Sequence, residues 1–214
     1  MALMLAMTRK LPQARDKQVG HDWRGMISAR TQREDELSGK TLLIIGLGGI
    51  GSRLAQLAKA FGLRVIGIKR NPATGGEAAD SAHALTDLKM LLPQADFVVL
   101  TCPLNEETEK VIDADALSRM KQSAYLVNAA RGRCVDELAL IKALQDQMIA
   151  GAAIDVTVEE PLPATSPLWG LSNVLITPHT AGETRRYEDN VIEILRDNLE
   201  RLWRGESQLR NQVV

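Results

Sequence analysis

The chain has 214 residues, of which 45% are hydrophobic, and its formal net charge is -1. A chain this close to neutral has no overall basic field to attract nucleic acid or anionic lipid, and an aromatic content of 3% leaves little surface for stacking bases. Its two cysteines, Cys102 and Cys134, have no CxxC partner, so the sequence supports neither a zinc site nor a disulfide framework. We therefore expect reduced thiols in a cytoplasmic protein without a bound metal.

The N-terminal segment predicts a helix. Residues 1–16 are rich in Leu, Met and Ala, and the apolar run 1–7 precedes Arg9 and Lys10, whereas a signal peptide has its positive residues first. The run is also too short to span a bilayer, so we expect no membrane association and a helix that is buried against protein. Residues 17–40 are polar and predict a connecting segment.

Short apolar strands then alternate with helical segments. Strands are predicted at 41–45, 63–68, 96–100, 124–127, 151–154 and 174–176, and helices at 50–61, 84–92, 113–120, 135–147 and 182–203. This alternation predicts an α/β fold with a Rossmann-like, doubly wound parallel sheet that helices cover on both faces. The final helix has an apolar face, which predicts packing against a neighbouring domain or subunit; the face comprises Tyr187, Val191, Ile194, Leu195, Leu199 and Leu202.

A glycine-rich turn, GLGGIG at residues 46–51, follows the first predicted strand. In this GxGxxG pattern Gly46 permits the tight turn, Gly48 lets the backbone approach a pyrophosphate, and Gly51 lets the helix pack closely on the sheet. A strand precedes the turn, a helix follows it and a second strand closes the unit, which is the context that the motif requires. The turn therefore predicts a dinucleotide site at a helix N-terminus.

Lys69 and Arg70 follow the second predicted strand, where NAD-binding units usually have Asp or Glu. A carboxylate would repel the 2′-phosphate of NADP, whereas two cations would attract it. The sequence therefore favours NADP over NAD as cofactor. The alternative is that both side chains point into solvent.

Three further segments follow predicted strands: 127–133, then 151–156 with 159–162, and finally 177–182. Ligands bind at the carboxyl edge of an open α/β sheet, where these segments begin. Together they contain an Arg, an acid and a His, which suits reduction of a 2-oxo acid. The His can donate a proton, the acid can orient the His, and the Arg can bind the substrate carboxylate.

These segments, in this order, resemble the D-isomer-specific 2-hydroxyacid dehydrogenases, which include phosphoglycerate and glyoxylate/hydroxypyruvate dehydrogenases. The resemblance implies that Arg131 binds substrate, that His179 is the acid/base and that Glu160 is its partner. It also implies that Asp155 holds the nicotinamide carboxamide, and that Arg131 and His179 contact the cofactor as well. Further cofactor contacts are expected at Gly49, Ile50, Cys102, Pro103, Ala129, Ala130, Ala181 and Gly182, beside the three glycines of the turn.

Some of these assignments have competitors in the sequence. Glu159 competes with Glu160, but the acid next to the proline is the family position. Arg133 competes with Arg131, and the Asn-x-x-Arg-Gly spacing favours Arg131. For His179 the alternative is an ordinary histidine at a helix start.

Three other residues stay outside the expected site. His21 and His83 lie outside every motif and are expected at the surface. Cys134 opens a predicted helix, where a thiolate would be stabilised, but no base for acyl transfer accompanies it, so we interpret it as structural.

The resemblance also implies a division into domains. Residues 1–30 would be an interdomain helix and linker, a remnant of the substrate domain; 31–182 the dinucleotide-binding domain; and 183–214 a C-terminal helix that returns to the substrate domain. Family members normally have a longer segment ahead of this helix, so we expect a truncated chain that binds a dinucleotide but is at best weakly active. The whole protein is expected to be a homodimer that acts on a small 2-oxo acid.

Three functions compete. The leading one is D-specific hydride transfer between NAD(P)H and a small 2-oxo or 2-hydroxy acid. The second is a non-catalytic dinucleotide-binding sensor or interaction module, which would not need the Arg-Glu-His set. A methyltransferase shares the glycine turn, but that function does not explain segments 127–133 and 177–182.

Overall fold

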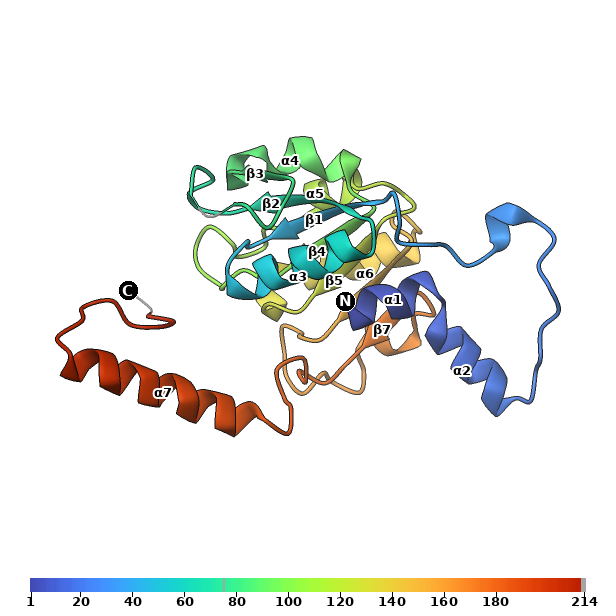
Figure 1. The fold of residues 1–214 in the computed structure, drawn as a ribbon. Helices are drawn as coiled ribbons and strands as arrows, with labels where there is room; N and C mark the ends of the chain where they lie inside the picture. The colour runs from blue at the N-terminus through green and yellow to red at the C-terminus, as the bar shows by residue number, and fades with distance from the viewer. Residues whose placement is uncertain (75, 213–214) are drawn as a thin grey trace. The chain divides into compact units, whose positions relative to one another are not determined.

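The computed structural model of the chain describes residues 1–74 and 76–212. The chain divides into two compact units, Met1–Pro178 and His179–Val214. The first unit is built on a seven-stranded, all-parallel sheet of order β3-β2-β1-β4-β5-β6-β7 (Figure 1). The strands are β1 Thr41–Ile45, β2 Arg64–Ile68, β3 Ser81–His83, β4 Phe97–Leu100, β5 Tyr125–Asn128, β6 Gly151–Ile154 and β7 Val174–Ile176. This order is that of a doubly wound Rossmann sheet, so the predicted fold class is confirmed.

Helices cover the sheet on both sides. The helices that contribute to the two core layers are α1 Ala2–Thr8, α3 Gly49–Ala60, α4 Leu88–Leu91, α5 Ala114–Arg119 and α6 Glu137–Gln145. The other two described α-helices are α2 Leu11–Val19 and, in the second unit, α7 Tyr187–Trp203. Five short 3-10 helices join them within the described ranges, at Arg30–Gln32, Leu85–Asp87, Leu92–Gln94, Gly132–Cys134 and Pro167–Gly170. Aspartate caps fix the starts of α5 and α6, because Asp113 accepts the N–H of Ala116 and Asp136 accepts the N–H of Ala139.

The central strand β1 shows how the two layers form. Leu42 and Ile44 face a core that also contains side chains of α1 and α3, while Leu43 and Ile45 face a core with side chains of α4, α5 and α6. Successive side chains of a strand point to opposite faces, so an unbroken apolar run is what a strand buried on both faces requires.

The predicted N-terminal helix is broken into two. Lys10, between α1 and α2, has a left-handed backbone with φ 49°, and Pro12 lies in the first turn of α2. A proline has no N–H to donate and its ring excludes the carbonyl of the preceding turn, so a continuous helix over 1–16 was a wrong prediction. The expected burial is confirmed for α1, whose Met4 and Met7 are buried and which packs on β5 and β6, whereas α2 buries none of its residues.

The sequence predicted no strand at β3. This edge strand has the sequence Ser-Ala-His, is half-buried and pairs with β2, so it lacks the apolar run that reveals the other strands. His83 lies in it, half-buried, with Nε2 3.0 Å from Ser81 Oγ, and is therefore part of the sheet rather than a free surface residue.

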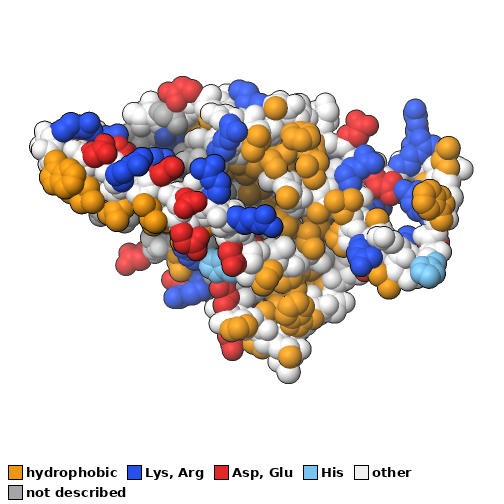
Figure 2. All heavy atoms as spheres, turned by 60° about the horizontal axis from the view of Figure 1, so that its bottom comes forward, with side chains coloured by type: hydrophobic (Ala, Val, Ile, Leu, Met, Phe, Trp, Pro, Cys, Tyr) orange, Lys and Arg blue, Asp and Glu red, His pale blue; other side chains and the backbone are white. Residues whose placement is uncertain are grey.

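The second unit consists mainly of α7. The helix begins at Tyr187, five residues later than predicted, because turn hydrogen bonds occupy the preceding stretch, where Glu183 N–H donates to Thr180 O and Tyr187 N–H to Thr184 O. Hydrophobic side chains form a stripe along α7, and several are exposed (Figure 2): Tyr187, Val191, Leu195, Leu199 and Leu202. Across the described ranges, no helix is both long and apolar enough to cross a membrane.

Candidate functional site

The glycine turn lies at the carboxyl end of β1, next to the loop that follows β4. Gly46 has φ +104°, and a Cβ on it would lie 2.5 Å from the backbone N of Cys102. The hydroxyl of Thr101 donates to Gly46 O over 2.8 Å. Only glycine fits at position 46, and the contact holds the turn against the loop at the point where the strand order reverses.

The N-terminus of α3 leaves room for a ligand. Gly48 is the N-cap and makes no side-chain cap, and no atom lies within 4 Å of a Cβ built on Gly48 or Gly49. A Cβ on Gly51 would lie 2.2 Å from Gly46 O, so this glycine lets the helix pack on the turn. The first turn of α3 has no acidic residue and exposes backbone N–H groups, so it fits the pyrophosphate of a dinucleotide. Ile50, the other residue of the turn, is exposed.

Lys69 and Arg70 follow β2, the neighbour of β1. The backbone N–H of Lys69 donates to His83 O over 3.0 Å, and its ammonium donates to the carbonyl of Thr74. The Arg70 side chain is exposed. Of the two cations, Lys69 is therefore engaged with the chain's own backbone, and Arg70 projects from the surface.

The loop after β5 is organised by a buried amide. Asn128 is 1% exposed; its Nδ2 donates to Arg131 O over 3.0 Å, and its Oδ1 accepts the N–H of Ala130 at 3.1 Å. These bonds fold residues 129–131 into a tight turn that leaves the Arg131 guanidinium at the surface, with Nη1 2.6 Å from Ala130 O. Ala129 and Ala130 lie within this turn, half-buried and buried respectively.

Next to this turn the backbone after β6 crosses Gly132. A Cβ on Gly132 would lie 1.9 Å from Thr157 O and 2.5 Å from Val158 N, so the two loops are in backbone contact. Thr157 N–H donates to Glu160 Oε1 over 3.1 Å, and the Thr157 hydroxyl donates to Glu159 O over 2.7 Å. The loops that carry Arg131 and Glu160 are thereby joined through Gly132 and Thr157.

Asp155 links the ends of three strands. It is only 3% exposed, its backbone N–H donates to Asn128 O over 2.9 Å, and its Oδ1 accepts a short hydrogen bond from the Thr177 hydroxyl. Thr177 N–H in turn donates to Ile154 O over 2.9 Å. The carboxyl edges of β5, β6 and β7 therefore form one connected polar layer.

The remaining candidates belong to the second unit. His179 begins it, has φ 56° and is exposed, as are Ala181 and Gly182. The first unit thus brings together the glycine turn, Cys102, Pro103 and the loops of Arg131, Asp155 and Glu160. His179 is the first residue of the second unit.

Comparison with known proteins agrees with this geometry. The family model of the D-isomer specific 2-hydroxyacid dehydrogenase NAD binding domain matches residues 1–181. The chain belongs to this family. The predicted family resemblance is therefore confirmed.

Three similar proteins illustrate the relationship. A D-3-phosphoglycerate dehydrogenase of Methanocaldococcus jannaschii is 38% identical over 208 residues, which is 96% of this chain and 38% of that protein. A glyoxylate reductase of Korarchaeum cryptofilum is 37% identical over 219 residues, which is 100% of this chain and 64% of that protein. The structure of a Xanthobacter autotrophicus D-isomer specific 2-hydroxyacid dehydrogenase, in complex with NADPH and MES, superposes with a TM-score of 0.83 at 32% identity, covering 99% of this chain and 83% of that one.

The chain therefore spans less than two thirds of both curated relatives, the phosphoglycerate dehydrogenase and the glyoxylate reductase. The family match shows that this chain is a nicotinamide dinucleotide-binding domain, and the match to the solved structure shows that it has the fold of the family.

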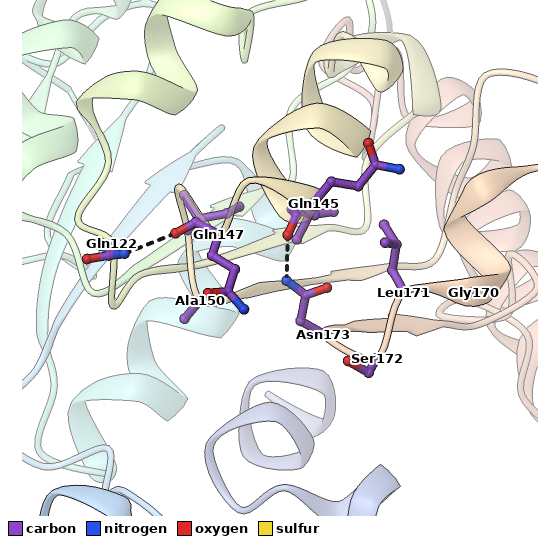
Figure 3. Close-up of a pocket in the computed structure, with 10 residues that line it drawn as sticks. Gln122, Gln145, Gln147, Ala150, Gly170, Leu171, Ser172 and Asn173 are labelled. Carbon is purple, nitrogen blue, oxygen red and sulfur yellow. Dashed lines mark hydrogen bonds between the residues drawn. The ribbon is translucent and has the colours of Figure 1, made fainter.

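A separate pocket of about 430 Å³ lies elsewhere on this 2-hydroxyacid dehydrogenase domain (Figure 3). It is lined by uncharged residues, among them Gln122, Gln147 and Asn173, and it sits beside the amino ends of β6 and β7. Gln122 Nε2 donates to Gln147 O over 3.3 Å, and Asn173 Nδ2 donates to Leu144 O over 3.2 Å (Figure 3). None of the predicted site residues lines it, and it occupies the edge opposite the one where ligands bind to such sheets.

Four polar residues of the candidate site were not among the predicted site residues: Thr101, Asn128, Thr157 and Thr177. Each lies at or just beyond a strand end and hydrogen bonds to the loop of a site residue. A polar residue directly after an apolar strand is a signal that could have found Thr101, Asn128 and Thr177. The partners lie far apart in sequence for Thr101 and Thr177, so no local pattern reveals the bonds themselves.

Cys102 and Cys134, which are 32 positions apart in the sequence, belong to the same buried hydrophobic core. Cys134 ends the 3-10 helix Gly132–Cys134, and α6 begins only at Glu137, so the prediction that Cys134 opens a helix is wrong. The residue that caps the start of α6 is Asp136. Both thiols are free and buried.

Proposed function

We propose that this chain binds NADP(H) or NAD(H) at the carboxyl edge of its sheet and provides the hydride-transfer site of a D-2-hydroxyacid dehydrogenase. The observation that carries the proposal is the backbone contact at Gly132, which joins the loops of Arg131 and Glu160 at the same edge of the sheet as the glycine turn. A dinucleotide cradle alone would need neither loop. Similar proteins described as glyoxylate reductase and phosphoglycerate dehydrogenase support a small 2-oxo acid as substrate.

The proposed roles follow the chemistry of each side chain. A bound reduced nicotinamide supplies the hydride. Arg131, exposed at the end of its turn, binds the substrate carboxylate and polarises the carbonyl. His179 donates the proton to the carbonyl oxygen, and Glu160 is the acid that the family pattern pairs with it. Asp155, held by Thr177, accepts a hydrogen bond from the nicotinamide carboxamide.

The remaining cofactor contacts are proposed around the turn. Gly46, Gly48, Gly49, Ile50 and Gly51 hold the pyrophosphate. The other proposed contacts are Lys69, Arg70, Cys102, Pro103, Ala129, Ala130, Ala181 and Gly182.

The domain assignment is also a proposal. Residues 1–30 and 183–214 would serve a substrate domain, and residues 31–182 the cofactor. Exposed apolar side chains in both flanking segments, including Trp23 and Leu195, support a protein partner for them. We also propose that the whole protein is a homodimer in the cytoplasm, where its free thiols stay reduced.

Direct assays test the proposed function. Titration of the 214-residue chain with NADPH should show saturable binding by nicotinamide fluorescence. Glyoxylate or hydroxypyruvate should then cause slow loss of absorbance of the reduced nicotinamide. Absence of NADPH and NADH binding would overturn the proposal, and tight binding without any turnover would favour the sensor or interaction module instead.

Replacing His179 with glutamine should separate binding from chemistry. Loss of a general acid lowers kcat by about 100-fold or more, while the dissociation constant for NADPH should change by less than about twofold. Stopped-flow or steady-state turnover with glyoxylate gives kcat, and fluorescence titration gives the dissociation constant. His21→Gln is the matched control, because His21 is exposed and outside the proposed site. Equal turnover in both variants would remove His179 from the mechanism.

The choice of cofactor depends on the cations after β2. The NADPH complex of the Xanthobacter relative supports NADP, and the exposed Arg70 is the cation available to a 2′-phosphate. Arg70→Ser should weaken NADPH binding by about tenfold, or about 1.4 kcal/mol, and leave NADH binding unchanged. Arg64→Ser is the matched control, because Arg64 is an exposed arginine at the opposite end of β2. Tighter binding of NADH than NADPH by the unaltered chain would contradict the preference.

A further inference from the structure

A pocket of about 350 Å³ lies next to the loop after β6 and has a charged lining. Two cations and three carboxylates line it. Each cation is paired with a carboxylate, Lys110 with Asp136 over 3.0 Å and Arg133 with Glu109 over 2.5 Å. The third carboxylate is that of Glu137, to which the proposed hydride-transfer mechanism assigns no role.

Glu137 hydrogen bonds to the backbone of the loop after β6. Its Oε2 accepts the N–H of Val158 over 3.0 Å. Glu137 is the first residue of α6, directly after the capping Asp136, and it is half-buried. The helix dipole favours an acidic side chain in this first turn, and a carboxylate accepts a stronger hydrogen bond from a backbone N–H than a neutral group does. The loop is therefore bonded to the start of a regular helix.

The peptide group between Thr157 and Val158 is held by two different contacts. Gly132 packs against it, since a Cβ there would lie 1.9 Å from Thr157 O and 2.5 Å from Val158 N. Glu137 accepts the N–H of the same peptide group. Thr157 N–H, one residue earlier, donates to Glu160 Oε1 over 3.1 Å. The place of this peptide group therefore determines where the Glu160 carboxylate is held.

We propose that Glu137 is a positioning residue, which holds the loop of residues 157–160 so that Glu160 can act as the partner of His179. This inference rests on the proposed function. Glu137 itself touches neither substrate nor cofactor and transfers no proton. Without its acceptor the loop loses one of its bonds, and the Glu160 carboxylate spends less time in the position that catalysis requires.

Two substitutions separate the acceptor of Glu137 from its charge. Glu137→Gln keeps an oxygen that can accept the N–H of Val158 but loses the charge, whereas Glu137→Ala loses both. Glu137→Ala should therefore lower kcat with glyoxylate about tenfold, and Glu137→Gln should restore kcat to within about twofold of the unaltered chain. The KM for glyoxylate and the dissociation constant for NADPH should change by less than about twofold in both variants, because neither ligand is bound by this loop in the proposal.

Asp115→Ala is the matched control, because Asp115 is likewise an acid in the first turn of a helix, α5, and its ion pairs join it to Lys89 and Arg119, outside the proposed site. This variant should keep the kcat of the unaltered chain. Equal turnover in Glu137→Ala and the unaltered chain would overturn the positioning role. An equal loss in both Glu137 variants would also overturn it, since the charge rather than the acceptor would then matter.

Amide hydrogen exchange, followed by NMR, measures the loop without any turnover. In Glu137→Ala the N–H groups of Val158 and Thr157 should exchange at least about tenfold faster. The N–H of Thr177, which donates to Ile154 O over 2.9 Å, should keep its rate. Faster exchange at Val158 alone would show that the effect does not reach the bond to Glu160, and would overturn the inference.

The two measurements distinguish the inference from the proposed function. If the unaltered 214-residue chain binds no dinucleotide and reduces no 2-oxo acid, the proposed function fails, and the exchange rates still decide whether Glu137 holds the loop. If the unaltered chain turns over and Glu137→Ala matches it in kcat, only the positioning role fails.

Discussion

Replacing Gly51 with alanine should weaken NADPH binding by about 100-fold, which corresponds to about 2.7 kcal/mol. The added Cβ would lie 2.2 Å from the carbonyl oxygen of Gly46 and 3.0 Å from the Thr101 hydroxyl oxygen. Neither the carbonyl nor α3 can relax alone, because Thr101 donates to that same carbonyl. The helix must therefore move away from the turn, and its backbone N–H groups then no longer point at the pyrophosphate.

The same substitution should lower stability. Overpacking of this kind costs about 3 kcal/mol, or a decrease in Tm of about 6–12 °C for a chain of this size. Gly49→Ala is the matched control, since a Cβ there meets nothing within 4 Å. That variant should keep its Tm, while its methyl group enters the space proposed for the phosphates. Calorimetry and fluorescence titration of both variants give the comparison, and an unchanged Tm for Gly51→Ala would contradict the packing argument.

Gly132→Ala should disrupt both catalytic loops at once. The new Cβ would lie 1.9 Å from Thr157 O and 2.0 Å from its carbonyl carbon. Both are backbone atoms, so movement of a side chain cannot relieve the clash. Either the turn of Arg131 or the segment of Thr157 must shift. Because Thr157 N–H donates to Glu160, a shift there also moves the proposed partner of His179. We expect a loss of about 3 kcal/mol in stability and a decrease in kcat of at least about 100-fold.

Gly170→Ala is the control for this variant, because no atom lies within 4 Å of its Cβ and the residue is far from the carboxyl edge. Thermal unfolding and turnover with glyoxylate separate the two effects. If Gly132→Ala lowered Tm but retained full turnover, the contact would be structural only. If it changed neither quantity, the close crossing of the two backbones would be wrong.

Most of the sheet could be predicted because burial on both faces forces an unbroken apolar run. Residues 42–45 of β1 are such a run, as are residues 65–68 of β2 and 97–100 of β4. The edge strand β3 could not be predicted, since one half-buried Ser-Ala-His segment carries no such run. The break at Lys10 has a visible signal in Pro12, which the prediction of one helix over 1–16 did not take into account.

The candidate site was predictable where it is formed by residues that are close together in the sequence. The glycine turn has a fixed spacing, so Gly46 and Gly51 were assigned the roles that the backbone contacts confirm. The contacts between loops were not predictable: Gly132 against Thr157 and Thr177 with Asp155 both join residues from different strand ends. Such contacts depend on the register of neighbouring strands, which no single segment of sequence specifies.

The position of β1 at the centre of the sheet has a consequence for the order of folding. Its partner β2 follows after one helix, but its other partner β4 pairs Phe97 with Leu42, across a long stretch of chain that contains β2 and β3. Closure of such a loop comes late, because its entropy cost must be met before the contact forms. Until then the glycine turn lacks Thr101 and Cys102 beside it. A dinucleotide would therefore recognise the nearly finished sheet, and would slow its unfolding rather than speed its folding.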